Sequence, residues 1–211
     1  MEPAKLYYVD GSPFARLCRA LILDWALPVE LVEMKFPLDD AFFEENPLGQ
    51  VPLLKTVGEN IFPTLQIAEQ LWAMTEEASV PTFDPLADRQ MMTVILSMGD
   101  ALVASAYQEW GGLEQTKPSK LGFDPGERNL ERAQRTLDWI EDQAGDWLCG
   151  DEVSVADYAL ASVLLWSESR REIKWKGRKK ILRIVEEVSQ GENFASTAPG
   201  PWVPPVVVTN T

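Results

Sequence analysis

The stretch Asn46-Pro47-Leu48-Gly49-Gln50-Val51-Pro52-Leu53-Leu54 decides how the rest of the chain is interpreted. A Pro-Leu-Gly turn leads directly into a short apolar strand, and Pro52 stands at the first step of that strand. Because proline has no N–H to donate to a sheet, Pro52 belongs at a strand start or a sheet edge. A cis bond before proline costs only about 0.5–1 kcal/mol. If the Val51–Pro52 bond is cis, the N–H and C=O of Val51 point outward, free to pair with an extended ligand. The simpler alternative is an ordinary turn from loop to strand.

The residues around this stretch predict alternating strands and helices. Ser12 as N-cap followed by Pro13 is a common helix start. A second helix is expected from Thr64, with Thr64 as its cap. Strands are expected at 5–9, 29–34, 51–55 and 60–62. The order β–α–β, then a hairpin and a helix, is typical of a thioredoxin-like domain, which we place at residues 1–76.

The rest of the chain is predicted to be helical. Residues 77–86 contain two prolines and no hydrophobic period, so we expect a linker there. Ser154 and Asp157 have the spacing of a capping box. Helices are expected at 87–110, at 127–143, from Ser154 and at 176–190. The predicted fold class is therefore α/β plus all-α: an N-terminal thioredoxin-like domain followed by a C-terminal helical bundle domain at 87–211.

Composition narrows the possible functions. The chain has 211 residues and a net charge of −14, which argues against nucleic acid as a partner. Histidine is absent, which excludes histidine-based catalysis and histidine metal sites. The two cysteines, Cys18 and Cys149, have no metal-ligand spacing and suit a reducing compartment. No apolar run approaches the roughly 20 residues of a membrane span, and no signal peptide is evident. We expect a soluble, cytoplasmic protein without a membrane partner.

Three separated motifs resemble the cytosolic glutathione transferases, over about residues 5–197. Asn-Pro-x-Gly-x-Val-Pro-x-Leu from Asn46 is similar to the glutathione-site signature of that family. Gly-Asp-x-x-Ser-x-Ala-Asp from Gly150 is similar to a folding motif of its second domain. The run from Ser12 to Phe14, Ser-Pro-Phe, looks like the start of helix 1 in tau-like and bacterial transferases. The resemblance implies glutathione as cofactor, attack of its thiolate on a small hydrophobic electrophile, and a homodimer.

Ser12 is the candidate catalytic residue. A free thiol has a pKa near 8.5, so lowering the pKa below 7 requires roughly 3 kcal/mol of preferential stabilisation of the anion. A hydrogen bond from Ser12 contributes about 1.5–3 kcal/mol, and the helix N-terminus adds roughly 0.3–1 kcal/mol. The two together can suffice without histidine. The alternatives are that Ser12 is a plain N-cap, or that Tyr8 supplies the hydroxyl, as a tyrosine of that strand does in other classes of the family.

The resemblance also implies the glutathione-binding residues. The peptide backbone of glutathione would lie along Gln50, Val51 and Pro52. Thr64 and its helix N-terminus would bind the γ-glutamyl carboxylate. Pro63 replaces the glutamate that usually binds the amine in this family. We hypothesise that Asp100 of the partner subunit supplies that carboxylate, with Gly99 allowing a second backbone to approach. The alternative is that Asp100 is an ordinary surface acid.

Four aromatic residues are candidates for the electrophile site between the domains, although each is equally compatible with the core: Phe14, Tyr107, Trp110 and Trp166. A basic run at 170–183 is either a solvated helix face or an entrance that attracts acidic substrates. Two other functions stay open. One is a glutathione-dependent isomerase, lyase or tailoring enzyme; the other is a non-catalytic interaction module. Pro63 favours the module, whereas Ser12 argues against it.

Overall fold

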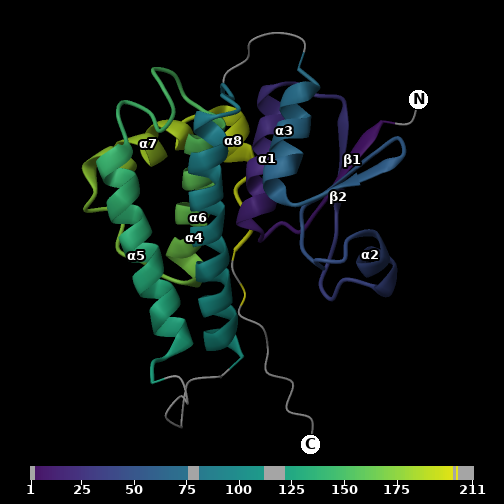
Figure 1. Cartoon of the computed structure of the whole chain (residues 1–211). Helices are drawn as coiled ribbons and strands as arrows, with labels where there is room; N and C mark the ends of the chain where they lie inside the picture. The colour runs from purple at the N-terminus through teal and green to yellow at the C-terminus, as the bar shows by residue number, and fades with distance from the viewer. Residues whose placement is uncertain (1–2, 76–80, 112–121, 202, 204–211) are drawn as a thin grey trace, which may run out of the picture.

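The structure, a computed structural model, describes residues 3–75, 81–111, 122–201 and 203 (Figure 1). Its strands are β1 (Ala4–Tyr8), β2 (Val29–Glu33), β3 (Leu53–Thr56) and β4 (Glu59–Ile61). Its N-terminal helices are α1 (Pro13–Asp24), α2 (Asp40–Glu45) and α3 (Thr64–Ala73). The remaining helices are α4 (Ala87–Trp110), α5 (Pro125–Gln143), α6 (Val155–Arg170), α7 (Lys179–Ser189) and α8 (Glu192–Ser196).

The strands form one mixed sheet in the order β2-β1-β3-β4. Strand β1 is parallel to β2 and antiparallel to β3, so that Leu6 lies between Leu31 and Leu54. Strands β3 and β4 form the predicted hairpin. This sheet and the helical remainder of the chain confirm the predicted fold class, a thioredoxin-like N-terminal part followed by a helical bundle.

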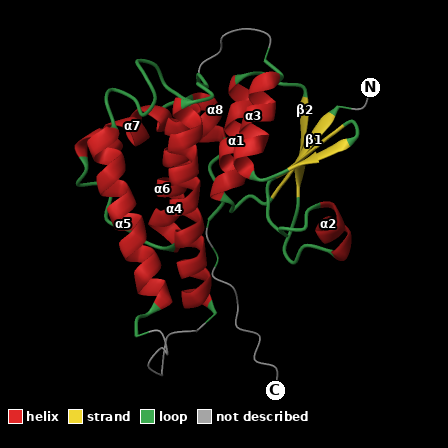
Figure 2. Ribbon diagram, in the orientation of Figure 1, coloured by secondary structure: helices red, strands yellow, loops and turns green. Residues whose placement is uncertain are grey.

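The sheet has a different core on each face. Helices α1 and α3 lie between the sheet and the remaining helices, and α2 lies on the other side (Figure 2). Leu6 and Leu54 are fully buried within the large core that includes α1 and α3. Four residues form a smaller core on the α2 side: Leu38, Phe42, Val51 and Leu53. Val51 is thus fixed by packing at the point where β3 begins.

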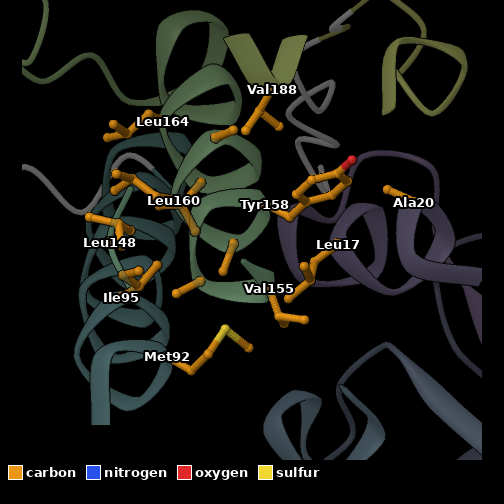
Figure 3. Close-up of a cluster of buried hydrophobic side chains, with 14 of the residues drawn as sticks. Leu17, Ala20, Met92, Ile95, Leu148, Val155, Tyr158, Leu160, Leu164 and Val188 are labelled. Carbon is orange, nitrogen blue, oxygen red and sulfur yellow. The ribbon is translucent and has the colours of Figure 1, made fainter. Parts of the chain in front are cut away.

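Helices α1 and α6 are buried on most of their surface, and they join the two halves of the molecule. Helix α6 is apolar around most of its circumference, as expected of a helix inside a core. Leu17 and Ala20 of α1 lie beside Val155 and Tyr158 of α6 (Figure 3). One continuous core therefore extends from the sheet through α1 and α6 to α7 and α8.

The predicted capping box is present at the start of α6. The Asp157 carboxylate accepts hydrogen bonds from the Ser154 N–H (2.8 Å) and hydroxyl (2.7 Å) and from the Leu148 N–H (3.0 Å). A second buried carboxylate, Asp88 of α4, accepts from the Ala156 N–H at 3.1 Å. Thr82 exchanges two backbone hydrogen bonds with the residues that flank Ser154. Of the predicted linker, residues 77–80 lie outside the described residues.

Several predicted boundaries shift. Helix α3 is capped by Pro63 rather than by Thr64, and no side chain hydrogen-bonds to its first turn. Helix α5 begins at Pro125 because Asp124 accepts hydrogen bonds from the N–H groups of Gly126 and Glu127. Helix α7 begins three residues later than predicted, and α8 was not predicted. Within the described part of the chain, every helix is too short or too polar to span a bilayer.

The capping box predicts a large effect of Asp157→Ala on stability. The substitution leaves the buried Ser154 and Leu148 N–H groups without their acceptor. We expect the free energy of unfolding at pH 7 to fall by at least about 2 kcal/mol in urea denaturation. Asp151→Ala is the matched control, because Asp151 is exposed, and should change the value by less than about 0.5 kcal/mol.

The effect of Asp157→Ala on the free energy of unfolding should depend on pH. Burial raises the pKa of Asp157 from 3.8 to about 6, and the hydrogen bonds from Ser154 and Leu148 oppose this rise. The folded chain therefore keeps a proton that the unfolded chain has released, and stability from this group falls as pH rises from about 4 to about 6. The stability difference between wild type and Asp157→Ala should shrink over this window. A difference that grows with pH would contradict the assignment.

Candidate functional site

A cavity of about 210 Å³ lies where the start of β3, the start of α3 and the middle of α4 meet. It collects most of the residues that the sequence singled out as binding residues. The lining residues predicted from the sequence are Phe14, Gln50, Val51, Pro52, Thr64 and Asp100. Those that sequence reasoning missed include Asn46, Leu48, Leu65, Thr93, Leu96 and Ser97. Thr93, Ser97 and Asp100 follow one another at helical spacing, a signal that could have found this face of α4.

Hydrogen bonds from the side chain of Asn46 hold the loop that carries Gln50 and Val51. This side chain is almost fully buried. Its amide donates to the Gln50 carbonyl at 2.6 Å and accepts from the Leu48 N–H at 3.0 Å. An Asn-Pro turn with these bonds defines the backbone path of the whole loop. Among the described residues, none accepts a hydrogen bond from the Val51 N–H. Val51 therefore brings an available donor to the wall of the cavity, and its bond to Pro52 is cis.

Gly49 is required at its position for two reasons. Its φ of +60° lies in the left-handed region, which side chains other than glycine rarely adopt. A Cβ atom there would also lie 2.7 Å from the ring of Phe43 in α2. Glycine thus lets α2 pack closely against the loop that bears Gln50 and Val51.

Ser12 lies at the N-terminus of α1, next to the cavity. Its hydroxyl accepts a hydrogen bond from the Ala15 N–H at 3.2 Å, which is the N-cap interaction. The same hydroxyl points its proton toward the Val51 carbonyl, at 3.5 Å. This distance is at the outer limit of a hydrogen bond, so the O–H is only weakly engaged. The cap and an available O–H donor therefore coexist on one side chain, since the cap uses the oxygen only as an acceptor. Tyr8, the alternative hydroxyl, has its ring under the Arg19 guanidinium at 4.4 Å.

The N-terminus of α3 opens onto the same cavity. Pro63 and Thr64 both line it, and the first turn of α3 contains no acidic residue. The first N–H groups of a helix have no partner within the helix, and here no side chain caps them. The arrangement supplies N–H donors and the positive end of a helix dipole, a combination that binds anions.

Asp100 is the only charged side chain among the described residues that line the cavity. It lies in the cavity of its own chain, so a partner subunit is not needed to bring it there. Its side chain remains exposed to solvent, yet nearby protein raises its pKa by desolvation, and the charge of Arg132 opposes this rise. An acidic group facing a helix N-terminus is complementary to a ligand that carries both an ammonium and a carboxylate.

Gly99 accommodates a side chain rather than a second backbone. A Cβ atom on Gly99 would lie 2.9 Å from the ring of Phe14 and 3.1 Å from Val163. The Phe14 ring therefore packs against α4 at a position that only glycine permits. Phe14 lies two residues after Ser12, so this contact also anchors the start of α1.

The other three predicted electrophile-site residues form a separate aromatic cluster on α4 and α6. The rings of Tyr107 and Trp110 are 5.3 Å apart, and those of Trp110 and Trp166 are 6.4 Å apart. Tyr107 is 55% exposed whereas Trp166 is only 5% exposed. The cluster thus has a buried base and an open edge, and it does not line the cavity that contains Phe14.

The basic run at 170–183 is largely engaged in ion pairs. Arg171 pairs with Glu109 at 2.6 Å, Arg178 with Asp138 at 2.6 Å and Lys176 with Glu168 at 2.8 Å. These contacts join the end of α6 to α4 and the segment before α7 to α5 and α6, which favours a structural role over substrate attraction. In the described part of the chain, no group of three or more acidic or cysteine side chains could hold a metal ion.

Comparison with known proteins agrees with this geometry. A protein of Escherichia coli (strain K12) named "Uncharacterized GST-like protein YibF" is 29% identical over 194 residues, which cover 89% of this chain and 95% of that protein. A glutathione S-transferase from Methylobacillus flagellatus KT, crystallised with GSH bound, has a TM-score of 0.80 and 25% identity, covering 93% of this chain and 100% of that one.

A glutathione S-transferase from Methylobacterium radiotolerans JCM 2831, in complex with glutathione sulfonate, has a TM-score of 0.78 and 23% identity, covering 97% and 99% of the two chains, and shares the fold. Residues 6–79 match the sequence model "Glutathione S-transferase, N-terminal domain", and residues 125–186 match "Glutathione S-transferase, C-terminal domain". The two matched segments have the expected order and together span more than half of the chain. The chain belongs to the glutathione S-transferase family.

Proposed function

We propose that this protein binds glutathione in the cavity beside α3 and activates its thiol through Ser12 for attack on a small hydrophobic electrophile. The reaction would transfer an alkyl or aryl group to sulfur. The observation that carries the proposal is that the Ser12 hydroxyl lies 3.5 Å from the carbonyl of Val51, the residue that lines the binding cavity. A ligand paired with the Val51 backbone places its neighbouring side chain beside this hydroxyl.

Each part of glutathione has a complementary group in the cavity. The cysteinyl backbone pairs with Val51, whose N–H is available. The γ-glutamyl carboxylate binds at the uncapped N-terminus of α3, beside Thr64. The ammonium faces Asp100, which replaces the carboxylate that Pro63 cannot provide. One similar protein was crystallised with GSH bound and another in complex with glutathione sulfonate, and these two structures support this choice of ligand.

The thiolate is stabilised by Ser12 and by the N-terminus of α1. The hydroxyl turns from the Val51 carbonyl to the sulfur without releasing the Ala15 N–H, because the cap uses the oxygen and the thiolate uses the proton. Phe14, the aromatic residue of the proposed set that lines the cavity, supplies an apolar wall for the electrophile. We also infer a cytoplasmic homodimer that forms through α3 and α4, the arrangement that the family resemblance implies; sedimentation at micromolar concentration measures the oligomeric state.

Gly49→Ala should weaken glutathione binding at least about tenfold in calorimetry. The new Cβ collides with Phe43 and displaces the loop that carries Gln50 and Val51. Gly58→Ala is the matched control. Gly58 also has a positive φ, of +89°, but a Cβ there meets nothing within 4 Å. Equal affinities for the two variants would show that the loop does not form the binding wall.

Ser12→Ala should lower kcat more than about tenfold, equivalent to ~1.4 kcal/mol, while the dissociation constant of glutathione changes less than about threefold. The hydroxyl stabilises the thiolate, whereas the backbone groups hold the peptide. Ser12→Thr retains both the cap and the O–H and should retain most activity, whereas Ser12→Asp retains the cap but replaces the O–H with a negative charge that repels the thiolate, and should be at least as inactive as Ser12→Ala. Turnover of Ser12→Ala within threefold of wild type would exclude Ser12 as the catalytic residue.

Asp100→Asn should weaken glutathione binding about threefold to tenfold, as expected for one ion pair at a solvent-accessible site. The loss should vanish with a glutathione analogue that lacks the α-amino group, because that ligand has no ammonium to lose. Asp142→Asn, an exposed acid of α5, is the charge-matched control. An equal loss for glutathione and for the analogue would refute the contact.

A further inference from the structure

The segment that follows α7 lies along the whole length of α1, which carries Ser12 at its start. Figure 1 shows the yellow chain after α8 descending beside α1. The Asn193 amide donates to Asp24, at the end of α1, at 2.9 Å. The Arg16 guanidinium donates to the Thr197 hydroxyl at 3.4 Å, and the Gly200 N–H donates to the Asp10 carboxylate at 2.8 Å. The contacts therefore run from the C-terminus of α1 to the loop before its N-terminus.

Two buried side chains, Phe194 and Thr197, anchor this segment. Phe194 is fully buried and packs edge-on against Tyr158 of α6, with ring centroids 5.4 Å apart. The Arg16 guanidinium lies over the other side of the segment, 4.3 Å from the Phe194 ring centroid. Thr197 is 1% exposed, whereas Gly200 is exposed. Buried side chains thus hold the segment as far as Thr197, and the exposed residue Gly200 beyond it contacts Asp10.

Asp10 connects this segment to α1. One carboxylate oxygen accepts from Gly200, and the other accepts from Arg19 of α1 at 3.1 Å. Asp10 lies in the turn from Val9 to Ser12, which is closed by the hydrogen bond from the Ser12 N–H to the Val9 carbonyl at 3.0 Å. The position of the Ser12 backbone is therefore defined by a turn that is held at Asp10 by two separate partners.

Three guanidinium groups surround this turn. Arg19 pairs with Asp10, and the charge of Asp10 also acts on Arg16 and Arg170. The pKa of Arg16 is lowered to about 10, chiefly by burial and also by the charge of Arg19, while the charge of Asp10 opposes the change. Replacing Asp10 thus alters the local charge as well as the geometry. The Gly200 N–H is the partner of Asp10 that can be removed without changing any charge.

We propose that residues 193–200 form a strap that holds the Ser12 hydroxyl in its working position, and that Asp10 is the positioning residue through which the strap acts. The inference rests on the proposed function of Ser12. The cap from Ala15 holds the hydroxyl to α1, whereas its contact with the Val51 carbonyl is only at 3.5 Å, so its place relative to a bound ligand depends on where the turn puts the start of α1. A shift of the turn by a fraction of an ångström changes the distance from the hydroxyl to a bound sulfur, and catalytic geometry is sensitive to such shifts.

Two substitutions at one position isolate the hydrogen bond. Gly200→Pro removes the N–H and therefore the bond to Asp10. Gly200→Ala keeps the N–H, and its Cβ would lie an ordinary 3.6 Å from the Asp10 carboxylate. Gly200→Ala is thus the reference against which Gly200→Pro is judged. Because position 200 is exposed, neither substitution should prevent folding, and thermal unfolding verifies this.

The first measurement is the pKa of the bound glutathione thiol, from the ultraviolet absorbance of the thiolate as a function of pH. We expect Gly200→Pro to raise this pKa relative to Gly200→Ala, with kcat at neutral pH reduced about threefold to tenfold and the affinity for glutathione little changed. A merely structural strap would lower the melting temperature and leave the pKa of the thiol unchanged. Identical thiol pKa values and kcat in the two variants would overturn the proposal.

The second measurement requires no ligand. Amide hydrogen exchange at Ser12 should be about threefold to tenfold faster in Gly200→Pro than in Gly200→Ala, because the Val9–Ser12 turn opens more often. In an Asp10→Ala background the two variants should behave alike. If wild type binds no glutathione, the proposed function fails, and the exchange of Ser12 still decides whether the strap holds the turn. Equal exchange rates would overturn the strap.

Discussion

Two buried carboxylates at the N-terminus of α6 are the interaction on which the rest of the structure depends. Asp157 holds the Ser154 and Leu148 N–H groups, and Asp88 holds the Ala156 N–H from the side of α4. Burial raises the pKa of both carboxylates, so each ion is retained at an energetic cost that its hydrogen bonds offset in part. Helix α6 begins at this network and contacts α1, α4 and α7. Its start therefore sets the position of helices that belong to both halves of the chain.

Packing between α6 and α1 links Ser12 to that network. Helix α6 supports α1 through the contacts of Val155 and Tyr158 with Leu17 and Ala20 (Figure 3). Helix α1 in turn has Ser12 as its N-cap, and the ring of Phe14 packs closely against α4 at Gly99. A folding motif far along the chain thus governs the geometry at Ser12.

The sequence predicted the elements whose signals are local. Ser12-Pro13 fixed the start of α1, and Ser154 with Asp157 fixed the start of α6, because caps are short-range hydrogen bonds. The cap of α3 was assigned to Thr64 instead of Pro63, since a hydroxyl is the usual cap and only the backbone path shows that Pro63 occupies the position. The sequence did not predict Asn46 or the α4 face as parts of the cavity wall. It also placed Asp100 in the cavity of a partner subunit. Both differences arise because the approach of α4 to the start of β3 is a long-range contact. The sequence also grouped Phe14 with Tyr107, Trp110 and Trp166 in one site. Their separation in the structure depends on which helix packs beside α1, which is again a long-range contact.

The charge distribution resolves an apparent conflict between an acidic protein and an acidic ligand. Glutathione carries two carboxylates and one ammonium at neutral pH, and the chain has a net charge of −14. Several side chains of the basic run at 170–183 are already paired with acids of α4, α5 or α6, so they add little positive field at the cavity. Under the proposed function, the attraction for carboxylate and thiolate would come from backbone N–H groups at the starts of α1 and α3, since the described cavity wall contains no lysine or arginine. Such dipoles act over about one helical turn, so the site recognises anions at short range while the surface as a whole repels them. Selectivity for one ligand then follows from matching backbone groups and Asp100 to its shape, rather than from net charge.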